Sequence, residues 1–137
     1  MGGAASSAVL RTLLLPPRLP THCLPRTALV DRLREASADR LALVLAGAGY
    51  GKTTLLAQAR EADSRPWIWV SCDERLDGHA GLLAHVTAAF QRRYPGVGAG
   101  LVFTGSAAGD AAVLADELAE TVPDDVVVAL DDVHLIS

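Results

Sequence analysis

The sequence lacks the features that mark secreted, membrane-spanning or zinc-binding proteins. It contains only two cysteines, Cys23 and Cys72, which are far apart and lack the C-x-x-C spacing of zinc and redox sites. Free thiols in a reducing cytoplasm are the simpler interpretation. No apolar run approaches the roughly 18–20 residues that a membrane span needs. The N-terminal stretch is interrupted by Arg11 and followed by prolines, unlike a secretory signal. We therefore expect a cytoplasmic protein that makes no membrane contact.

The chain also lacks the charge pattern of a nucleic-acid-binding segment. Its formal net charge is −4, with no tract of like charges and no internal repeat, so we expect no DNA contact from this segment. Its histidines, at positions 22, 79, 85 and 134, show no metal-ligand spacing, and surface or hydrogen-bonded structural histidines are the simpler interpretation. At 137 residues, half of them hydrophobic, the chain is of single-domain size and can bury a core.

The most informative segment is a glycine-rich loop that follows the apolar run at residues 41–45. It reads Ala-Gly-Ala-Gly-Tyr-Gly-Lys-Thr over residues 46–53, which is the Walker A pattern of phosphate-binding P-loops. Glycines let backbone N–H groups curl around an anion, and the helix expected next adds its positive end. Lys52 would reach the β- and γ-phosphates, and the Thr53 hydroxyl would bind Mg²⁺. From this segment, the expected nucleotide-binding residues are Gly47, Ala48, Gly49, Tyr50, Gly51, Lys52, Thr53 and Thr54.

One position departs from the strict P-loop pattern. The pattern G-x-x-x-x-G-K-[ST] begins with glycine, whereas this chain has Ala46. Alanine is small enough for the strand-to-loop turn but cannot adopt a positive φ at low cost. The alternative interpretation of the segment is a glycine-rich turn that merely precedes a helix.

A second apolar run predicts the metal-binding half of the site. The β-branched run at residues 126–130 is typical of a buried parallel strand, and it ends in Asp131 and Asp132. Ligands of open α/β sheets bind beyond the carboxyl ends of the strands. We expect Asp131 to hold Mg²⁺ in the manner of a Walker B aspartate, and Asp132 to position the attacking water. The alternative is a solvated acidic turn after a strand.

Strand-like and helix-like segments alternate along the chain, which predicts an α/β fold with a parallel sheet and right-handed crossovers. Residues 1–25 are expected to form an irregular Pro-rich lead-in, and residues 26–137 the NTPase-like part. We expect Thr27 to cap the first helix, Leu29 and Leu33 to lie on its buried face, and residues 96–100 to form a flexible loop. The expected helices cover 27–36, 52–62, 81–94 and 107–121, and the expected strands cover 41–46, 67–70 and 126–130.

Four segments occur in the order and rough spacing of one family. They are residues 12–20 (Thr-Leu-Leu-Leu-Pro-Pro-Arg-Leu-Pro), residues 24–33 (Leu-Pro-Arg-Thr-Ala-Leu-Val-Asp-Arg-Leu), the P-loop segment 46–56, and residues 130–136 (Leu-Asp-Asp-Val-His-Leu-Ile). The chain resembles the N-terminal ATP-binding region of the large LuxR-family transcriptional regulators of the maltose-activator type. These are STAND-type switch ATPases related to AAA proteins. Alanine at the first P-loop position is common in that family.

The resemblance implies a P-loop NTPase fold, a three-layer arrangement whose parallel sheet is flanked by helices. It implies that Arg26 lies over the nucleotide, although an exposed charge near a helix start is an equal alternative. It also implies a further strand after the Asp-Asp strand, then helical repeats and a C-terminal DNA-binding helix-turn-helix. We therefore expect the sheet to be incomplete and the chain to be a truncated fragment.

The leading functional hypothesis is an ATP- and Mg²⁺-binding segment of a nucleotide-dependent switch that regulates transcription. Hydrolysis would be slow and confined to the longer protein, with Lys52 and Asp132 as the catalytic candidates. The sequence leaves open whether the chain self-associates in its ATP-bound state. One alternative is a metabolic P-loop kinase, which would need a lid and arginines that clamp the transferred phosphoryl group. Another alternative is a non-functional remnant.

Overall fold

The computed structural model describes residues 9–19, 26–36, 51–76 and 78–132. The expected strand at 41–46 and most of the glycine-rich loop lie outside these residues. The elements within them are η2 (Arg11–Leu14), α1 (Thr27–Ala36), α2 (Lys52–Ala62), β1 (Trp67–Ser71), α3 (Gly78–Arg93), α4 (Ala107–Thr121) and β2 (Val127–Asp131).

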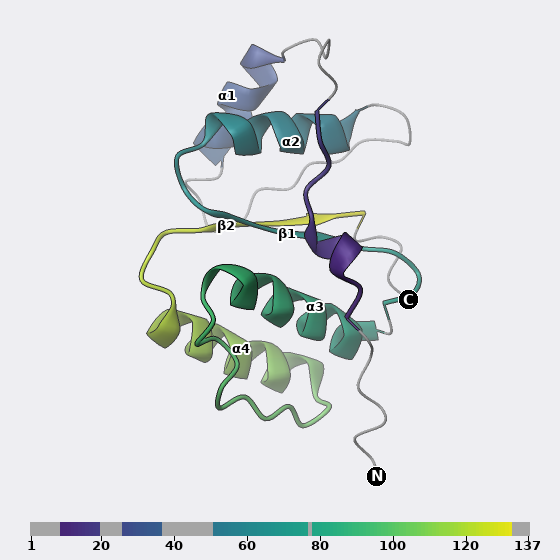
Figure 1. Ribbon diagram of the computed structural model, residues 1–137, viewed down its shortest axis with the longest axis vertical. Coiled ribbons are helices and arrows are strands. Elements are labelled where there is room, and N and C mark those ends of the chain that lie inside the picture. The colour runs from purple at the N-terminus through teal and green to yellow at the C-terminus, as the bar shows by residue number, and fades with distance from the viewer. Residues whose placement is uncertain (1–8, 20–25, 37–50, 77, 133–137) are drawn as a thin grey trace.

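The two strands form a small parallel sheet between two layers of helices. Strands β1 and β2 pair in parallel, from Trp67 opposite Val127 to Ser71 opposite Asp131. Helices α1 and α2 lie on one face of the sheet, and α3 and α4 lie on the other (Figure 1). Parallel strands cannot be joined by a tight turn, and α3 and α4 supply the crossover between them. The predicted α/β class and parallel pairing are thereby confirmed.

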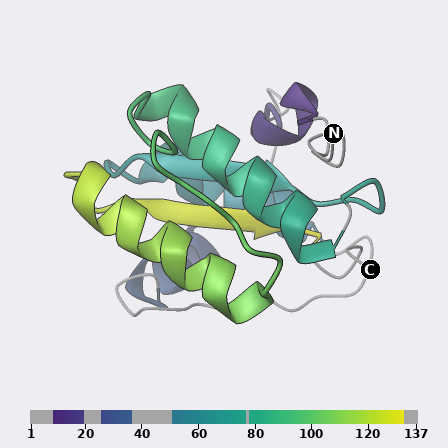
Figure 2. The ribbon, with the colours of Figure 1, turned by 90° about the horizontal axis from the view of Figure 1, so that it is seen from below.

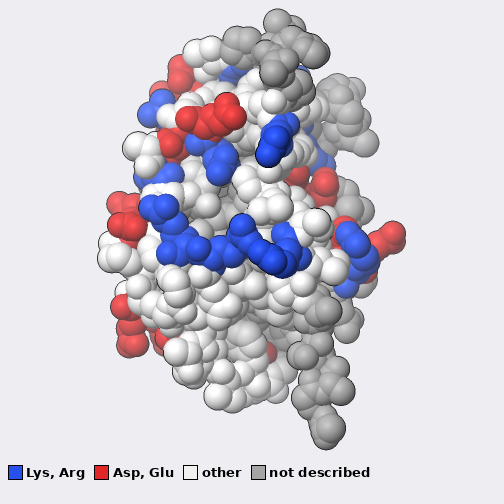
Figure 3. Space-filling model, viewed as in Figure 1, with Lys and Arg blue, Asp and Glu red and all other residues white. Residues whose placement is uncertain are grey.

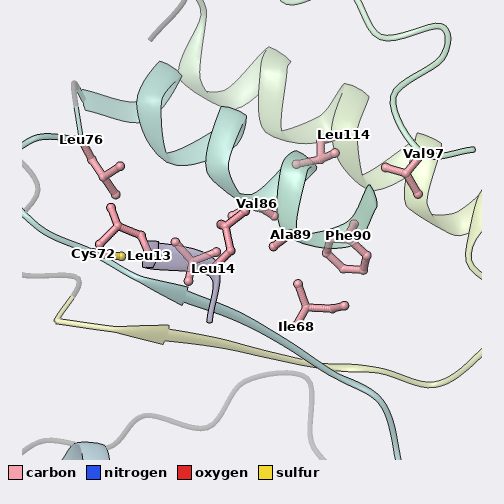
Figure 4. Packing of buried hydrophobic residues seen from close by; sticks show 11 residues of the cluster. Leu13, Leu14, Ile68, Cys72, Leu76, Val86, Ala89, Phe90, Val97 and Leu114 are labelled. Carbon is pink, nitrogen blue, oxygen red and sulfur yellow. The ribbon is translucent and has the colours of Figure 1, made fainter. Parts of the chain in front are cut away.

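The main hydrophobic core fills the space between the sheet and helices α3 and α4. Seen from below, these two helices run side by side across the strands (Figure 2). Each large apolar side chain that is fully buried contributes about 1.5–3 kcal/mol, as an upper estimate. The core residues, most of which are labelled in Figure 4, are Leu13, Leu14, Ile68, Val70, Cys72, Leu76, Val86, Ala89, Phe90, Val97 and Leu114.

The proline-rich lead-in, which was expected to be irregular, contributes to this core. Its short helix η2 inserts Leu13 and Leu14, which are 8% and 6% exposed. The Leu10 N–H donates to His85 Nε2 over 3.1 Å. His85 Nδ1 lies 2.8 Å from the Gly81 carbonyl, so the neutral tautomer protonated on Nδ1 satisfies both contacts. His85 is therefore a hydrogen-bonded structural histidine, as expected.

The first helix covers the expected residues but differs from its prediction in its cap and on its buried face. The Val30 N–H donates to the Arg26 carbonyl over 2.9 Å, so Arg26 precedes the helix and Thr27 is its first residue rather than its cap. Val30 is 7% exposed, whereas Leu29 is 42% exposed. The prediction for Leu29 is wrong because α1 packs on α2 through Val30 and the partly buried Leu33, against Leu55 and Ala59.

Two further predictions need adjustment on the other side of the sheet. Helix α3 begins at Gly78 rather than Gly81, because the apolar periodicity that marked the helix starts only at Leu82. The loop at 96–100, expected to be flexible, is anchored: Val97 is 1% exposed in the core. The Gly98 N–H also donates to the Glu117 carboxylate over 2.8 Å. Within the described ranges, no helix is long and apolar enough to cross a membrane.

Candidate functional site

The candidate site lies where the start of α2 meets the carboxyl end of β2. Helix α2 begins at Lys52, and the preceding Gly51 adopts the left-handed conformation with φ 73° and ψ 25°. Glycine adopts this conformation without the strain that a Cβ would cause. Gly51 has no side chain with which to cap the first N–H groups of α2, and the N–H donors and positive dipole end of a helix start attract anions.

The hydroxyl of Thr53 forms a hydrogen bond with the carboxylate of Asp131. Thr53 Oγ1 donates to Asp131 Oδ2 over 2.7 Å. Asp131 is the last residue of β2 and is 4% exposed, so it does not lie in a solvated turn. Its backbone is also fixed, because the Cys72 N–H donates to the Asp131 carbonyl over 2.7 Å. The sheet therefore holds this carboxylate against the first turn of α2.

The next carboxylate, that of Asp132, is paired with Lys52. Lys52 Nζ lies 3.1 Å from Asp132 Oδ1, and the two side chains are 20% and 37% exposed. Asp132 has φ 58°, and among the described residues it alone has a positive φ without being glycine. Aspartate tolerates the left-handed region better than most residues. The turn after β2 thus places Oδ1 beside the ammonium group.

Arg26 lies against the end of the glycine-rich loop. A Cβ built on Gly51 would lie 2.9 Å from Arg26 Nη2 and 3.2 Å from Arg26 Cζ, so the guanidinium packs on the face that glycine leaves open. The Arg26 N–H donates to Gln58 Oε1 over 3.3 Å. Arg26 is thus both an exposed charge at a helix start and a neighbour of the loop.

The buried thiol of Cys72 lies near the acidic end of β2. The pKa of this thiol is raised to about 11, mainly by burial and in addition by the negative charges of Asp131, Asp132 and Asp73. The thiol therefore stays protonated near neutral pH, in agreement with the expectation of an unreactive free cysteine. The three aspartates that raise the pKa of Cys72 also show that negative charge is concentrated at this edge of the sheet.

The structure brings together most of the predicted site residues that it describes. Arg26 and Gly51 are in contact, Lys52 meets Asp132, and Thr53 meets Asp131. Thr54 lies in the first turn of α2 and is half-buried. Gln58 was missed, because its role depends on how α1 packs on α2 and no motif marks it. The predicted residues Gly47, Ala48, Gly49 and Tyr50, like Ala46, lie outside the described residues.

The donor set fits a magnesium ion shared with a phosphate ligand. Mg²⁺ usually takes one or two protein ligands and completes its shell with water and phosphate oxygens. The Thr53 hydroxyl and the Asp131 carboxylate supply such a pair. Within the described part of the chain, no three His, Cys, Asp or Glu side chains cluster in a way that would hold a metal by themselves.

Comparison with known proteins finds relatives in sequence among the curated proteins. No family profile and no solved structure matches the chain. The chain is similar to the serine/threonine-protein kinase PknK of Mycobacterium tuberculosis, in strains H37Rv and CDC 1551, and of Mycobacterium bovis. It is 34% identical to each over 131 residues, which cover 88% of this chain. The chain spans only 12% of the length of these relatives, so it is similar to a small part of a much longer protein.

Proposed function

We propose that this chain binds ATP with Mg²⁺ at the start of α2 and is the nucleotide-binding part of a P-loop switch that regulates transcription. The observation that carries the binding proposal is the hydrogen bond from Thr53 Oγ1 to Asp131 Oδ2. The two residues lie 78 positions apart in sequence, and one belongs to the loop motif and the other to the strand motif from which a shared metal site was expected.

Each neighbouring group has a role in this proposal. The N–H groups at the start of α2 and the Lys52 ammonium would bind the phosphates. Thr53 and Asp131 would hold Mg²⁺, which would neutralise phosphate charge when bound. Arg26, which packs on Gly51, would lie over the nucleotide. Asp132 is the candidate for positioning water, once it is released from Lys52.

The role as a switch within a longer protein rests on weaker support. It is supported by the resemblance of four sequence segments to LuxR-type regulators. The length of the relatives, of which the chain spans 12%, is in keeping with output and sensing parts that lie elsewhere. In such a protein, nucleotide binding would bias a conformational equilibrium, and slow hydrolysis would reset it.

A kinase is the second candidate, favoured by the relatives, which are named as serine/threonine-protein kinases. Kinases and P-loop switches share ATP and Mg²⁺, but a kinase also needs groups that clamp the transferred phosphoryl. Arginines gather across the middle of the face seen in Figure 3, with acidic side chains around them. Among the arginines of the chain, Arg65 pairs with Asp63 and Arg75 pairs with Asp73. This pairing disfavours a clamp built from them.

The composition of the chain allows a direct test of binding. Lys52 is the only lysine in the sequence, so amine acylation followed by mass spectrometry reports on it and on the N-terminal amine alone. MgATP should protect Lys52 and leave the N-terminal amine unchanged, and it should raise the melting temperature because it binds only the folded state. Equal labelling and an unshifted melt at millimolar MgATP would refute the proposal. Transfer of labelled phosphate to a Ser/Thr peptide would favour the kinase.

A further inference from the structure

We infer that Asp132 is an internal counter-ion of Lys52 that competes with nucleotide phosphate and makes binding depend on Mg²⁺. This inference rests on the proposed function and concerns how the same site is regulated. It gives Asp132 a role before nucleotide binds, which differs from positioning water. The observation that carries it is the Lys52–Asp132 ion pair, with 3.1 Å between Nζ and Oδ1.

The two side chains that would bind a phosphate and its metal, those of Lys52 and Thr53, already interact with carboxylates at the end of β2. Lys52 is held by Asp132, and the Thr53 hydroxyl is held by Asp131. A metal-free nucleotide must therefore break the ion pair and bring its own negative charge close to two carboxylates. Neighbouring like charges repel strongly where solvent is partly excluded. This applies to Asp131, because it is only 4% exposed.

A divalent cation changes this balance. Bound by Asp131 and Thr53, it would offset the carboxylate charge and attract the phosphates, so that Lys52 could exchange Asp132 for the nucleotide. Arg26, packed on Gly51, is the other basic group that the structure places against the start of α2. The site would therefore favour the metal complex of a nucleotide over the free nucleotide by more than the phosphate-binding loop alone provides.

The turn that carries Asp132 is suited to this role and to its test. Its left-handed backbone, with φ 58°, brings the carboxylate back toward α2. Asparagine adopts the same region readily. Asp132→Asn therefore removes the charge with little change in shape and without new backbone strain.

The experiment is an equilibrium titration of the parent chain and Asp132→Asn with a fluorescent ATP analogue, once with Mg²⁺ and once with EDTA. In EDTA, we expect Asp132→Asn to raise the affinity for the nucleotide analogue about two- to tenfold. The variant no longer has to break a partly exposed ion pair, and it also loses one carboxylate that repels the phosphates. The ratio of the Mg²⁺-bound to the metal-free affinity should fall. Lys52 should also be acylated faster in the empty variant, because it is released from its partner.

Asp73→Asn is the matched control. Asp73 lies at the same edge of the sheet and carries the same charge, but its partner is Arg75. Asp73→Asn should change the affinity for the nucleotide analogue in EDTA less than twofold. An equal gain in both variants would show a general charge effect and overturn the inference.

The remaining outcomes separate this inference from the proposed function. If the parent chain binds the Mg²⁺–nucleotide complex but Asp132→Asn leaves the affinity ratio unchanged, the counter-ion role is wrong and the proposed function stands. If Lys52 is acylated at the same rate in both chains, the ion pair does not hold Lys52, and the inference also fails. If neither chain binds nucleotide under either condition, both are wrong.

Discussion

Substitution of Gly51 by alanine tests two features of the site: the left-handed backbone at Gly51 and the packing of Arg26 on it. Gly51 has φ 73°, in the left-handed region. An L-residue held there is less stable by about 1–2 kcal/mol. The added Cβ would lie 2.9 Å from Arg26 Nη2, which is closer than real Cβ contacts allow. Because the blocked atom is the far end of a long side chain, we expect Arg26 to move at small energetic cost.

Gly51→Ala should therefore lower the free energy of unfolding by about 1–2 kcal/mol, measured by urea denaturation followed by circular dichroism. Gly105→Ala is the matched control, because Gly105 has φ 95° and its Cβ would meet nothing within 4 Å. Gly100→Ala, which adds a Cβ in open space without a positive φ, should change stability little. The first two variants should lose stability to a similar extent.

Nucleotide binding should distinguish the first two variants. Gly51→Ala displaces Arg26 and stiffens the loop, so it should weaken MgATP binding, whereas Gly105→Ala should not. In an Arg26→Ala background the contact is absent, so the additional loss of binding caused by Gly51→Ala should shrink. If Gly51→Ala keeps the stability and MgATP affinity of the parent chain, then neither the left-handed conformation nor the packing of Arg26 on it matters as argued.

Three further changes test other parts of the structure. Thr53→Val should lower the free energy of unfolding by about 1–3 kcal/mol in a urea melt, because it leaves the buried Asp131 carboxylate without its donor; Thr53→Ser should restore most of the loss. The Arg65 side chain, followed by its backbone N–H and the indole of Trp67, holds the pKa of Asp63 below its usual range. The stability this provides is present above about pH 4 and lost as the pH falls through the folded value, so thermal melts of Asp63→Asn should show a weaker decline in acid than those of the parent. Leu14→Ala should destabilise the fold by about 2–5 kcal/mol if the lead-in belongs to the core, whereas an unchanged urea midpoint would show that η2 does not pack as described.

The helices were predictable where local signals marked both their ends and their apolar face. Helix α2 begins directly after Gly51, as the loop motif implies. Helix α4 begins after Ser106, whose side chain accepts from the Gly109 N–H over 3.3 Å, and it ends before Pro123. The two apolar runs that became β1 and β2 were equally clear as strands, because continuous β-branched or aromatic residues favour a parallel sheet. Strand β1 is buried along its centre, but Val128 and Leu130 of β2 are 41% and 38% exposed, so the expectation of a fully buried strand is wrong for β2.

Contacts between distant segments were not predictable. The bond between Leu10 and His85 joins residues 75 positions apart, and no local pattern indicates that a proline-rich lead-in packs on α3. Nor did the sequence show that Val30 rather than Leu29 would be buried, since both fit a helical face and only the position of α2 decides between them.

For the candidate site, the sequence identified the participants but not their pairing. Lys52, Thr53, Asp131 and Asp132 each follow from a motif with a physical role. That the lysine meets Asp132 and the threonine meets Asp131 depends on how closely the end of β2 approaches α2. The roles of these residues toward nucleotide and metal remain predictions.

The measurement that tests the central claim most directly is an equilibrium titration with MgATP of the parent chain, Lys52→Ala and Arg75→Ala. Arg75→Ala removes the same charge from a residue whose side chain is 61% exposed and pairs with Asp73. We predict saturable binding by the parent chain and Arg75→Ala, and at least about tenfold weaker binding by Lys52→Ala, as expected for loss of the lysine that reaches the phosphates. Equal binding by the parent chain and Lys52→Ala, or no binding by either, would contradict the account.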